Sequence, residues 1–432
     1  MSIRGTLLSL ALSLISTSAA MAFDWGGSLN NLSSSQSPVQ EDIVSLWIGQ
    51  DFSPALALKA QGSYAYLNEN PHFFDIAEVS ARGTLPLSGG SSGALSYALG
   101  RIQVADSTSL VYSGDIDGAS LAYAGALCTI SAWGGYTGLL FGGSTPVAMS
   151  AADRALVVIG GDDLGGKRIV EALGIAFPEL FLRQDLRVEA VAEQDRNSGL
   201  AAAGETAVSS SAVPVNSQFY TLRLAGPLVF PLYWDGFFTL ENGTTLTPGP
   251  SNVYADSSQL AYMGGLGFRL YLERLLGSRL ELSWLYTSGD TDATAFASSN
   301  GSGTWSLFVP VTNTYLGEVF QIAPGNVWRM LLSYSIKPLS GASADRLQLV
   351  AKGTAFFRST AGPLSLPGSN PATTSPYLGT ELFGEIDWRP FSDLGLSLGG
   401  GYFFANDGPE GALVESLLPA NYLIHVTASF SF

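Results

Sequence analysis

The chain is poor in charged residues and in the side chains that build metal and catalytic sites. Charged residues make up 13% of its 432 residues, about half of the share that is usual in soluble globular proteins. The single cysteine, Cys128, excludes an intramolecular disulfide bond and a thiolate cluster for zinc or iron–sulfur. Neither histidine, His72 nor His425, has a recognisable pattern of catalytic partners. We therefore expect no enzymatic activity, no metal and no cofactor.

Clusters of basic residues are missing as well. Lysine and arginine number 20 against 36 aspartates and glutamates, which gives a formal net charge of −16. A nucleic-acid partner is excluded, because neutralising phosphates requires clustered lysines and arginines. The stretch Gly161–Lys167 matches part of the phosphate-binding G-x-x-x-x-G-K loop, but Arg168 replaces the Ser or Thr that would hold Mg²⁺. Nucleotide binding is therefore not expected.

The first 22 residues have the pattern of a secretory signal peptide. Arg4 supplies the positive charge, Leu7–Ile15 the short apolar core and Ala20–Ala22 the cleavage motif. The rest of the sequence has no apolar run of about 18 residues, so a transmembrane helix is not expected. We predict a signal peptide at residues 1–22 and a single β domain at residues 23–432. That domain is either a secreted all-β protein or an outer-membrane β-barrel.

Alternating polar and apolar residues favour the barrel. In Arg346–Arg358, the polar residues Arg346, Gln348, Lys352, Thr354 and Arg358 alternate with mostly apolar ones, and in Tyr422–Phe432 the polar residues His425, Thr427, Ser429 and Ser431 do the same. Lipid-facing and lumen-facing side chains alternate in this way along the strands of a membrane barrel. We predict an all-β fold, a transmembrane antiparallel up-and-down β-barrel of about 18 strands, with 16 as the fallback. The predicted strands are residues 23–32, 42–52, 55–68, 72–86, 93–103, 117–126, 128–141, 168–178, 184–195, 216–229, 232–247, 258–274, 278–288, 321–337, 344–358, 377–390, 394–406 and 420–432.

The connections between these segments alternate in length, as barrels require of periplasmic turns and outer loops. With the N-terminus in the periplasm, every second connection is short, for example 230–231, whereas most of the others are long, for example 142–167 and 289–320. The 69–71 connection is the exception. Phe432 ends an alternating strand and resembles the terminal signature that barrel-insertion machinery recognises. We therefore predict a bacterial outer-membrane location, with membrane lipid and the insertion machinery as partners.

Five stretches carry a resemblance to a known family. They are Asp115–Gly118, Ser131–Gly138, Glu189–Arg196, Tyr377–Leu382 and Gly399–Phe404. Together they resemble the alginate-export type of outer-membrane porin, an 18-stranded family. The resemblance implies a pore in residues 23–432 that passes a polymer or a small hydrophilic solute.

The alternation directs charges of both signs toward the lumen, where they would tune passage. It also places Arg101 on that side. An exporter of an acidic polysaccharide should have a strongly basic lumen, so the mixture leaves the substrate open. We predict a porin-like channel for passive transport or export of a hydrophilic solute or polysaccharide. The predicted lumen-lining residues are Lys59, Arg82, Arg187, Glu189, Glu193, Arg223, Glu241, Arg269, Arg279, Glu281, Arg329, Arg346, Lys352, Glu381 and Glu385.

Alternatives remain open for the function and for one loop. An uptake barrel for hydrophobic, fatty-acid-type substrates has an N-terminal plug, for which alternation that starts near Phe23 leaves no room. A surface adhesin would use the acidic outer loops to bind neighbouring or host components. The 142–167 connection is either a constriction that folds into the lumen or a surface loop. The paired acids Asp115/Asp117 and Asp290/Asp292 fit solvated loops, since neither pair has the ligand count of a calcium loop. The Gly- and Ser-rich composition of Ser288–Gly303 also predicts a solvated loop.

Overall fold

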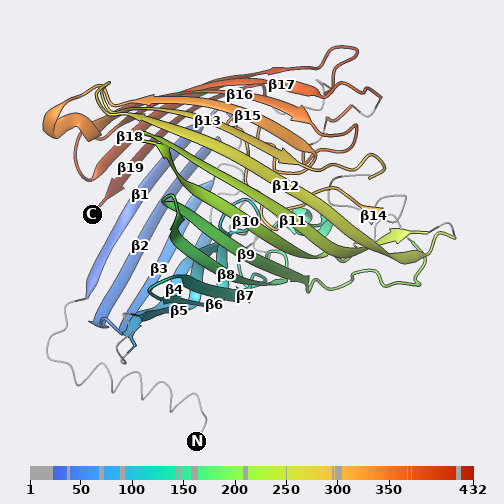
Figure 1. The fold of residues 1–432 in the computed structure, drawn as a ribbon, viewed down its shortest axis with the longest axis horizontal. Helices are drawn as coiled ribbons and strands as arrows, with labels where there is room; N and C mark the ends of the chain where they lie inside the picture. The colour runs from blue at the N-terminus through green and yellow to red at the C-terminus, as the bar shows by residue number, and fades with distance from the viewer. Residues whose placement is uncertain are drawn as a thin grey trace, which may run out of the picture.

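One antiparallel sheet closes on itself to form a barrel (Figure 1). Closure occurs at β1 (Asp24–Ser34), which pairs with β2 (Gln40–Ser53) and with β19 (Tyr422–Ser431). The predicted signal peptide and His72 lie outside the described residues. The computed structural model describes residues 23–36, 39–67, 73–87, 93–141, 145, 147–156, 164–207, 213–249, 251–293, 296, 304–366, 368–370, 372–414 and 420–432.

Eighteen strands form the wall, each paired with its neighbours in the sequence, which confirms the predicted fold and strand number. Two short helices, α2 (Ala151–Leu156) and η1 (Gly341–Arg346), lie in connections. The two-residue strand β14 (Thr304–Trp305) is outside the wall and pairs in parallel with β12. The other wall strands are β3 (Leu56–Leu67), β4 (Phe73–Pro86), β5 (Ala94–Ala105), β6 (Ser113–Ala124), β7 (Thr129–Tyr136), β8 (Arg168–Phe181), β9 (Gln184–Asp195), β10 (Asn216–Val229), β11 (Leu232–Pro248), β12 (Tyr254–Leu272), β13 (Ser278–Thr287), β15 (Val327–Ile336), β16 (Leu347–Arg358), β17 (Tyr377–Trp388) and β18 (Leu394–Ala405).

The outer face of the wall is apolar and the inner face is polar or covered. On β10, Tyr220 and Leu222 are about half exposed, whereas Phe219 and Thr221, which alternate with them, are buried. Successive side chains of a strand point to opposite faces, so this difference separates the outside of the barrel from its lumen. Among the described residues, no helix has the length and apolar character that crossing a membrane requires.

The predicted strand boundaries are wrong where connections fold into the lumen. The predicted strand 321–337 begins six residues before Val327, the first residue of β15. Ile322 and Ala323 are instead buried inside the barrel as part of the preceding loop, so their apolar character reflects packing in the lumen. The predicted strand 128–141 is likewise too long, since β7 ends at Tyr136.

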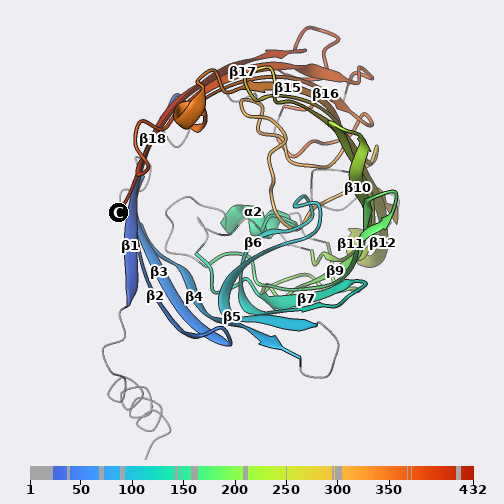
Figure 2. The same cartoon turned by 60° about the vertical axis from the view of Figure 1, so that its left-hand side comes forward.

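The hairpin of β5 and β6 leaves the wall and enters the lumen, as Figure 2 shows for β6. Pairing of β4 with β5 stops at Val79 and Arg101, beside Gly100. Gly100 has a φ of 114°, and a Cβ there would lie 2.1 Å from the carbonyl oxygen of Val79. Glycine therefore permits the bend. Beyond it, Ile102 and Ile116 are buried in the lumen.

Arg101 is predicted to face the lumen, but it lies on the hairpin face opposite Ile102, which is the face of the exposed Leu99 two residues earlier. Its guanidinium donates to both carboxylate oxygens of Asp117, at 2.9 and 2.8 Å. It also donates to the carbonyl oxygens of Ile76 (2.9 Å) and Leu139 (3.1 Å). Arg101 therefore joins β4 to the chain that follows β7, and Asp117 is engaged by an arginine.

An apolar core fills part of the lumen. It is centred on the connection between β13 and β15, in which Trp305, Leu307 and Phe308 are fully buried. The prediction of a solvated segment at Ser288–Gly303 is wrong at its start, since Ser288 and Asp290 are buried and both bond to Ser306. Dispersion and hydrophobic burial thus hold this loop inside the barrel.

Candidate functional site

The lumen is the candidate site, and its wall holds the inward loops through buried carboxylates. Glu381 on β17 is 1% exposed. It accepts three backbone N–H groups of the β13–β15 connection: Glu318 at 3.0 Å, Val319 at 2.9 Å and Phe320 at 2.8 Å. Hydrogen bonds to an ionised carboxylate are stronger than neutral ones. The carboxylate of Glu381 therefore holds the β13–β15 connection against the wall.

Glu241 and Glu189 have the same kind of role. Glu241 on β11 accepts the backbone N–H of Val309 at 3.0 Å and a side-chain N–H of Gln259 at 2.6 Å. Glu189 on β9 accepts the backbone N–H of Ser107, at the tip of the inward β5–β6 hairpin, at 2.5 Å. Both carboxylates are buried beneath the loops whose backbone N–H groups they accept.

A buried charge cluster holds the β7–β8 connection inside the lumen. Arg168 Nη2 lies 2.7 Å from Asp153 of α2 and 3.1 Å from Asp195, and Nη1 lies 2.5 Å from Glu193. These four side chains are 0% exposed, so each charge depends on the others for stabilisation. Figure 2 shows α2 inside the ring of strands. Of the two alternatives for the 142–167 connection, its described residues therefore fit the one in which the loop folds into the lumen.

The end of α2 adds a cation to this inward loop. Arg154 donates to the carbonyl oxygens of Ala148 (3.2 Å) and Ser365 (3.2 Å), and its guanidinium lies 4.5 Å from the ring centre of Phe296. Burial lowers the pKa of Arg154 to about 10, so it stays charged at neutral pH. The contact with Ser365 connects the loop before β8 to the loop before β17.

A second group of predicted residues forms an arginine stripe across neighbouring strands. The stripe consists of Arg187 (β9), Arg223 (β10), Arg269 (β12) and Arg279 (β13), together with Asp235 (β11) and Glu281 (β13). Four cations against two anions leave a net charge of +2. Arg187 and Arg223 lie directly opposite each other in the β9–β10 register. Like charges so placed repel, which favours an anion between them.

The acids of the stripe are engaged mainly by Arg269 and Arg279. Asp235 lies 2.5 Å from Arg269 and 3.9 Å from Arg223, and Glu281 lies 3.5 Å from Arg279 and 3.9 Å from Arg269. Arg223 also donates to the carbonyl oxygen of Ser107. Within the described part of the chain, Arg187 has no hydrogen bond or ion pair. The positive charge that Asp235 and Glu281 leave unmatched is therefore concentrated at Arg187 and Arg223, with Glu189 on β9 as a further acid near Arg187.

The remaining predicted residues are dispersed around the lumen. Arg329 is largely covered by the β13–β15 connection and donates to Leu316 O at 2.7 Å. Arg346 belongs to η1 at the turn end of the barrel, because the predicted strand 344–358 begins only at Leu347. The ion pairs of the other dispersed residues are Lys59 with Glu78 (2.8 Å), Arg82 with Glu78, Lys352 with Glu318 (2.6 Å) and Glu385 with His425 (3.6 Å).

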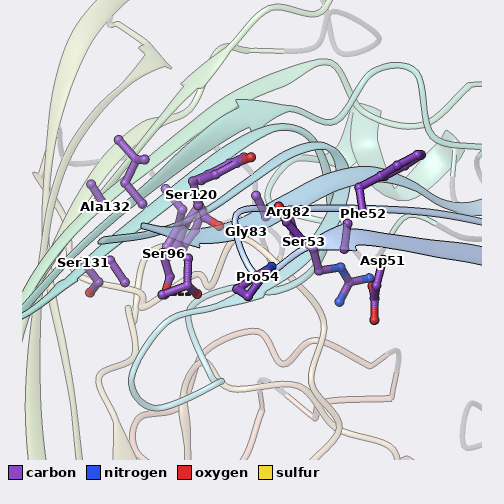
Figure 3. Close-up of a pocket in the computed structure, with 17 residues that line it drawn as sticks. Asp51, Phe52, Ser53, Pro54, Arg82, Gly83, Ser96, Ser120, Ser131 and Ala132 are labelled. Atoms are coloured by element: carbon purple, nitrogen blue, oxygen red, sulfur yellow. Dashed lines mark hydrogen bonds between the residues drawn. The ribbon is translucent and has the colours of Figure 1, made fainter. Parts of the chain in front are cut away.

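Two cavities lie beside these charges. The larger, of about 830 Å³, is lined by small hydroxyl residues of β5 to β7 and by Arg82 and Trp133. Figure 3 shows Ser96, Ser120 and Ser131 on adjacent strands of this cavity. The second, of about 550 Å³, is polar and lies around η1, the end of β17 and the start of β18. The second cavity therefore suits hydrated, hydrogen-bonding solutes.

Sequence reasoning missed the residues that hold the loops, chiefly Arg168, Asp153 and Gly100. The apolar run Leu307–Val311 was an available signal, since a solvated loop has no need of five consecutive residues of this kind. In the described part of the chain, no group of three or more His, Cys, Asp and Glu side chains could hold a metal ion.

Comparison with solved structures identifies related folds. OccK5 (OpdH) of Pseudomonas aeruginosa is similar with a TM-score of 0.56 and 10% identity, over 95% of this chain and 98% of that one. OprD of the same organism has a TM-score of 0.53 and 10% identity, over 96% and 97%. OpdK of that organism, in a crystal structure with vanillate, has a TM-score of 0.52 and 10% identity, over 95% of this chain and 98% of that one. No protein-family model and no curated protein matches the chain. At this identity, the likeness establishes the barrel fold.

Proposed function

We propose that this protein is an outer-membrane channel through which small hydrophilic solutes diffuse. The observation that carries the proposal is the closed 18-stranded wall with an apolar outer face and a charged, cavity-lined inner face. A barrel of this size is wide enough for an aqueous lumen. Its neighbours in structure are outer-membrane porins, which supports the same function here.

The arginine stripe favours anionic solutes. Arg187 and Arg223 carry positive charge that the acids of the stripe leave unmatched, so a carboxylate would find two guanidinium groups side by side. Arginine binds carboxylates through paired N–H donors. The structure of OpdK with vanillate, a carboxylate, is in keeping with this preference. The proposed substrate class is therefore small organic anions.

The export of an anionic polysaccharide, which the resemblance to alginate-export porins implies, is the second candidate. The arginine stripe favours it, because a polyuronate would bind the same guanidinium groups. The inward loops favour small solutes instead, since they reduce the cross-section available to a polymer. Block of the channel by uronate oligomers of increasing length would separate the two candidates.

The proposed location also explains the two ends of the chain. The predicted signal peptide at residues 1–22 would direct export across the inner membrane. Phe432 exchanges backbone hydrogen bonds of 3.1 Å with Gly27, so the final residue takes part in closing the wall. A terminal aromatic residue at the closing strand fits recognition by the insertion machinery, which we propose as a partner.

Conductance of the purified full chain in planar bilayers tests the proposal. We expect ohmic channels that favour anions. Removing Arg187 and Arg223 together, each to Gln, should lower the anion-to-cation permeability ratio about fivefold, since one charge at 4 Å in water is worth about 1 kcal/mol. Arg183→Gln, in the exposed turn between β8 and β9, is the matched control. Unchanged selectivity in the double variant would refute the stripe, whereas absence of any conductance would refute the channel and favour an adhesin or a hydrophobic-substrate barrel.

A further inference from the structure

The short turns at one end of the barrel expose bulky apolar side chains. Leu182 is 85% exposed and Phe230 is 75% exposed, although both occupy tight turns where polar residues are usual. Exposed apolar surface that gathers in one region of a protein marks contact with another protein or with a membrane. We call these residues the turn-end ring: Leu127, Leu182, Phe230, Leu275, Leu276 and Phe391.

The turn-end ring follows the circumference of the barrel. Its members lie in the turns that join β6 to β7, β8 to β9, β10 to β11, β12 to β13 and β17 to β18. These five turns are distributed from one side of the closed sheet to the other. A protein partner would contact one sector of this rim, whereas a membrane contacts all of it. The distribution therefore points to a surrounding lipid layer.

The ring continues the apolar band of the outer wall. On three strands, an outward-facing polar residue near the loop end is separated from an exposed apolar residue at the turn end by 10, 11 and 12 residues. A strand rises about 3.3 Å per residue and is tilted by about 40°, so these separations span about 25–30 Å along the barrel axis. The pairs are Asp42 and Phe52, Glu171 and Leu182, and Gln218 and Phe230.

That height equals the apolar belt of about 25 Å that membrane barrels present to lipid. The belt reaches its full height only when the turns are included. Tryptophans prefer the membrane–water interface, and Trp25 and Trp388, which are 69% and 47% exposed, lie at this same end of the wall. Phe391 follows Trp388 by three residues, so the turn begins at the level of the interface.

We propose that the turn-end ring inserts into the inner leaflet of the outer membrane, so that phospholipid covers the turns and this mouth of the barrel is flush with the membrane. The inference rests on the outer-membrane location proposed above. It identifies lipid headgroups and upper acyl chains as the partner of this surface. It further implies that no collar of the barrel projects into the periplasm at these turns.

A single-cysteine fluorescence experiment tests the insertion. In a Cys128→Ser background, an environment-sensitive dye is attached to Leu182→Cys, Phe230→Cys or Phe391→Cys, and the labelled protein is reconstituted in phospholipid vesicles with lipid-borne or water-soluble quenchers. Leu222→Cys, in the middle of the apolar belt, is the lipid control, and Ser198→Cys, in the exposed β9–β10 connection, is the aqueous control.

We expect the three turn positions to emit at shorter wavelength than Ser198→Cys, to be quenched from the lipid, and to lose most of their aqueous quenching. Emission and aqueous quenching equal to those of Ser198→Cys would overturn the proposal and leave a periplasmic protein as the partner. Ion flux through the same vesicles is measured separately. Lipid-quenched turns without ion flux would overturn the channel and keep the insertion. Ion flux with turns that are not quenched from the lipid would overturn the insertion and keep the channel.

Discussion

The three hydrogen bonds of Glu381 make it the support of the β13–β15 connection inside the lumen. We predict that Glu381→Gln releases residues 316–323 from the wall. The carboxylate accepts the N–H groups of Glu318, Val319 and Phe320 at 2.8–3.0 Å. Phe320 stacks on Phe403 at 4.2 Å between ring centres, so the same release separates these two rings.

The magnitude follows from the number of donors. Glutamine keeps one acceptor oxygen but replaces the other with an NH₂ group, which cannot accept an N–H. At least one buried N–H then loses its partner, at about 1–3 kcal/mol, and the remaining bonds lose the advantage of a charged acceptor. A total of about 3 kcal/mol corresponds to roughly a hundredfold rise in the population of the released loop, at 1.4 kcal/mol per factor of ten.

Single-channel recording and limited proteolysis measure this change. We expect Glu381→Gln to show a larger or noisier conductance and to be cleaved sooner in the β13–β15 connection. Glu318→Gln is the matched control, because that acid is 42% exposed and forms only a peripheral ion pair with Lys352. A Glu381→Gln protein with the parental conductance and parental protease resistance would refute the assignment of Glu381 as the anchor.

Three further predictions concern the packing of the barrel and its turns. Arg168→Met leaves three carboxylates buried without their cation, so the free energy of unfolding in detergent should fall by about 3–5 kcal/mol; an unchanged denaturant midpoint would contradict this. Gly100→Ala places a Cβ 2.1 Å from Val79 O and should cost about 1–3 kcal/mol, seen as a lower temperature of gel-shift unfolding. Lys337 holds the pKa of Asp345 below its ordinary value through a hydrogen bond, so this contribution to stability is present at neutral pH and is lost as the pH falls through that lowered pKa. Lys337→Gln should raise the pKa of Asp345, as measured by NMR titration.

Local alternation was sufficient to predict the wall. Each strand has one face toward the outside, so a period of two identifies strands such as β16 and β19 without any knowledge of their partners. The same period predicts a shared face for Arg187, Arg223 and Arg269, and Arg223 and Arg269 lie near the same carboxylate, that of Asp235. Strand ends such as Val327 were missed because the inward loop before β15 is also apolar.

The two-residue alternation of a strand does not predict which loop covers an inward-facing residue. Glu381 contacts residues 61 to 63 positions away in the sequence, and Glu241 contacts Val309 at a separation of 68. A carboxylate beneath a loop and a carboxylate facing water have the same local pattern. The direction of Arg101 was assigned wrongly for a different reason, because its charge suggested the lumen although it shares the face of the exposed Leu99.

The departure of the β5–β6 hairpin also gives the barrel a taper. Between Arg101 and the turn end, all eighteen strands form the circumference of the barrel. Between Arg101 and the loop end, the β5–β6 hairpin has left the wall, and the Arg101 side chain connects Ile76 of β4 to Leu139. Barrel diameter grows roughly linearly with strand number, so losing two strands narrows that end by about a tenth. A solute that enters from the loop end therefore meets the smaller cross-section first and then a widening vestibule. Sieving by size would take place at one mouth, and the other would let solutes leave freely.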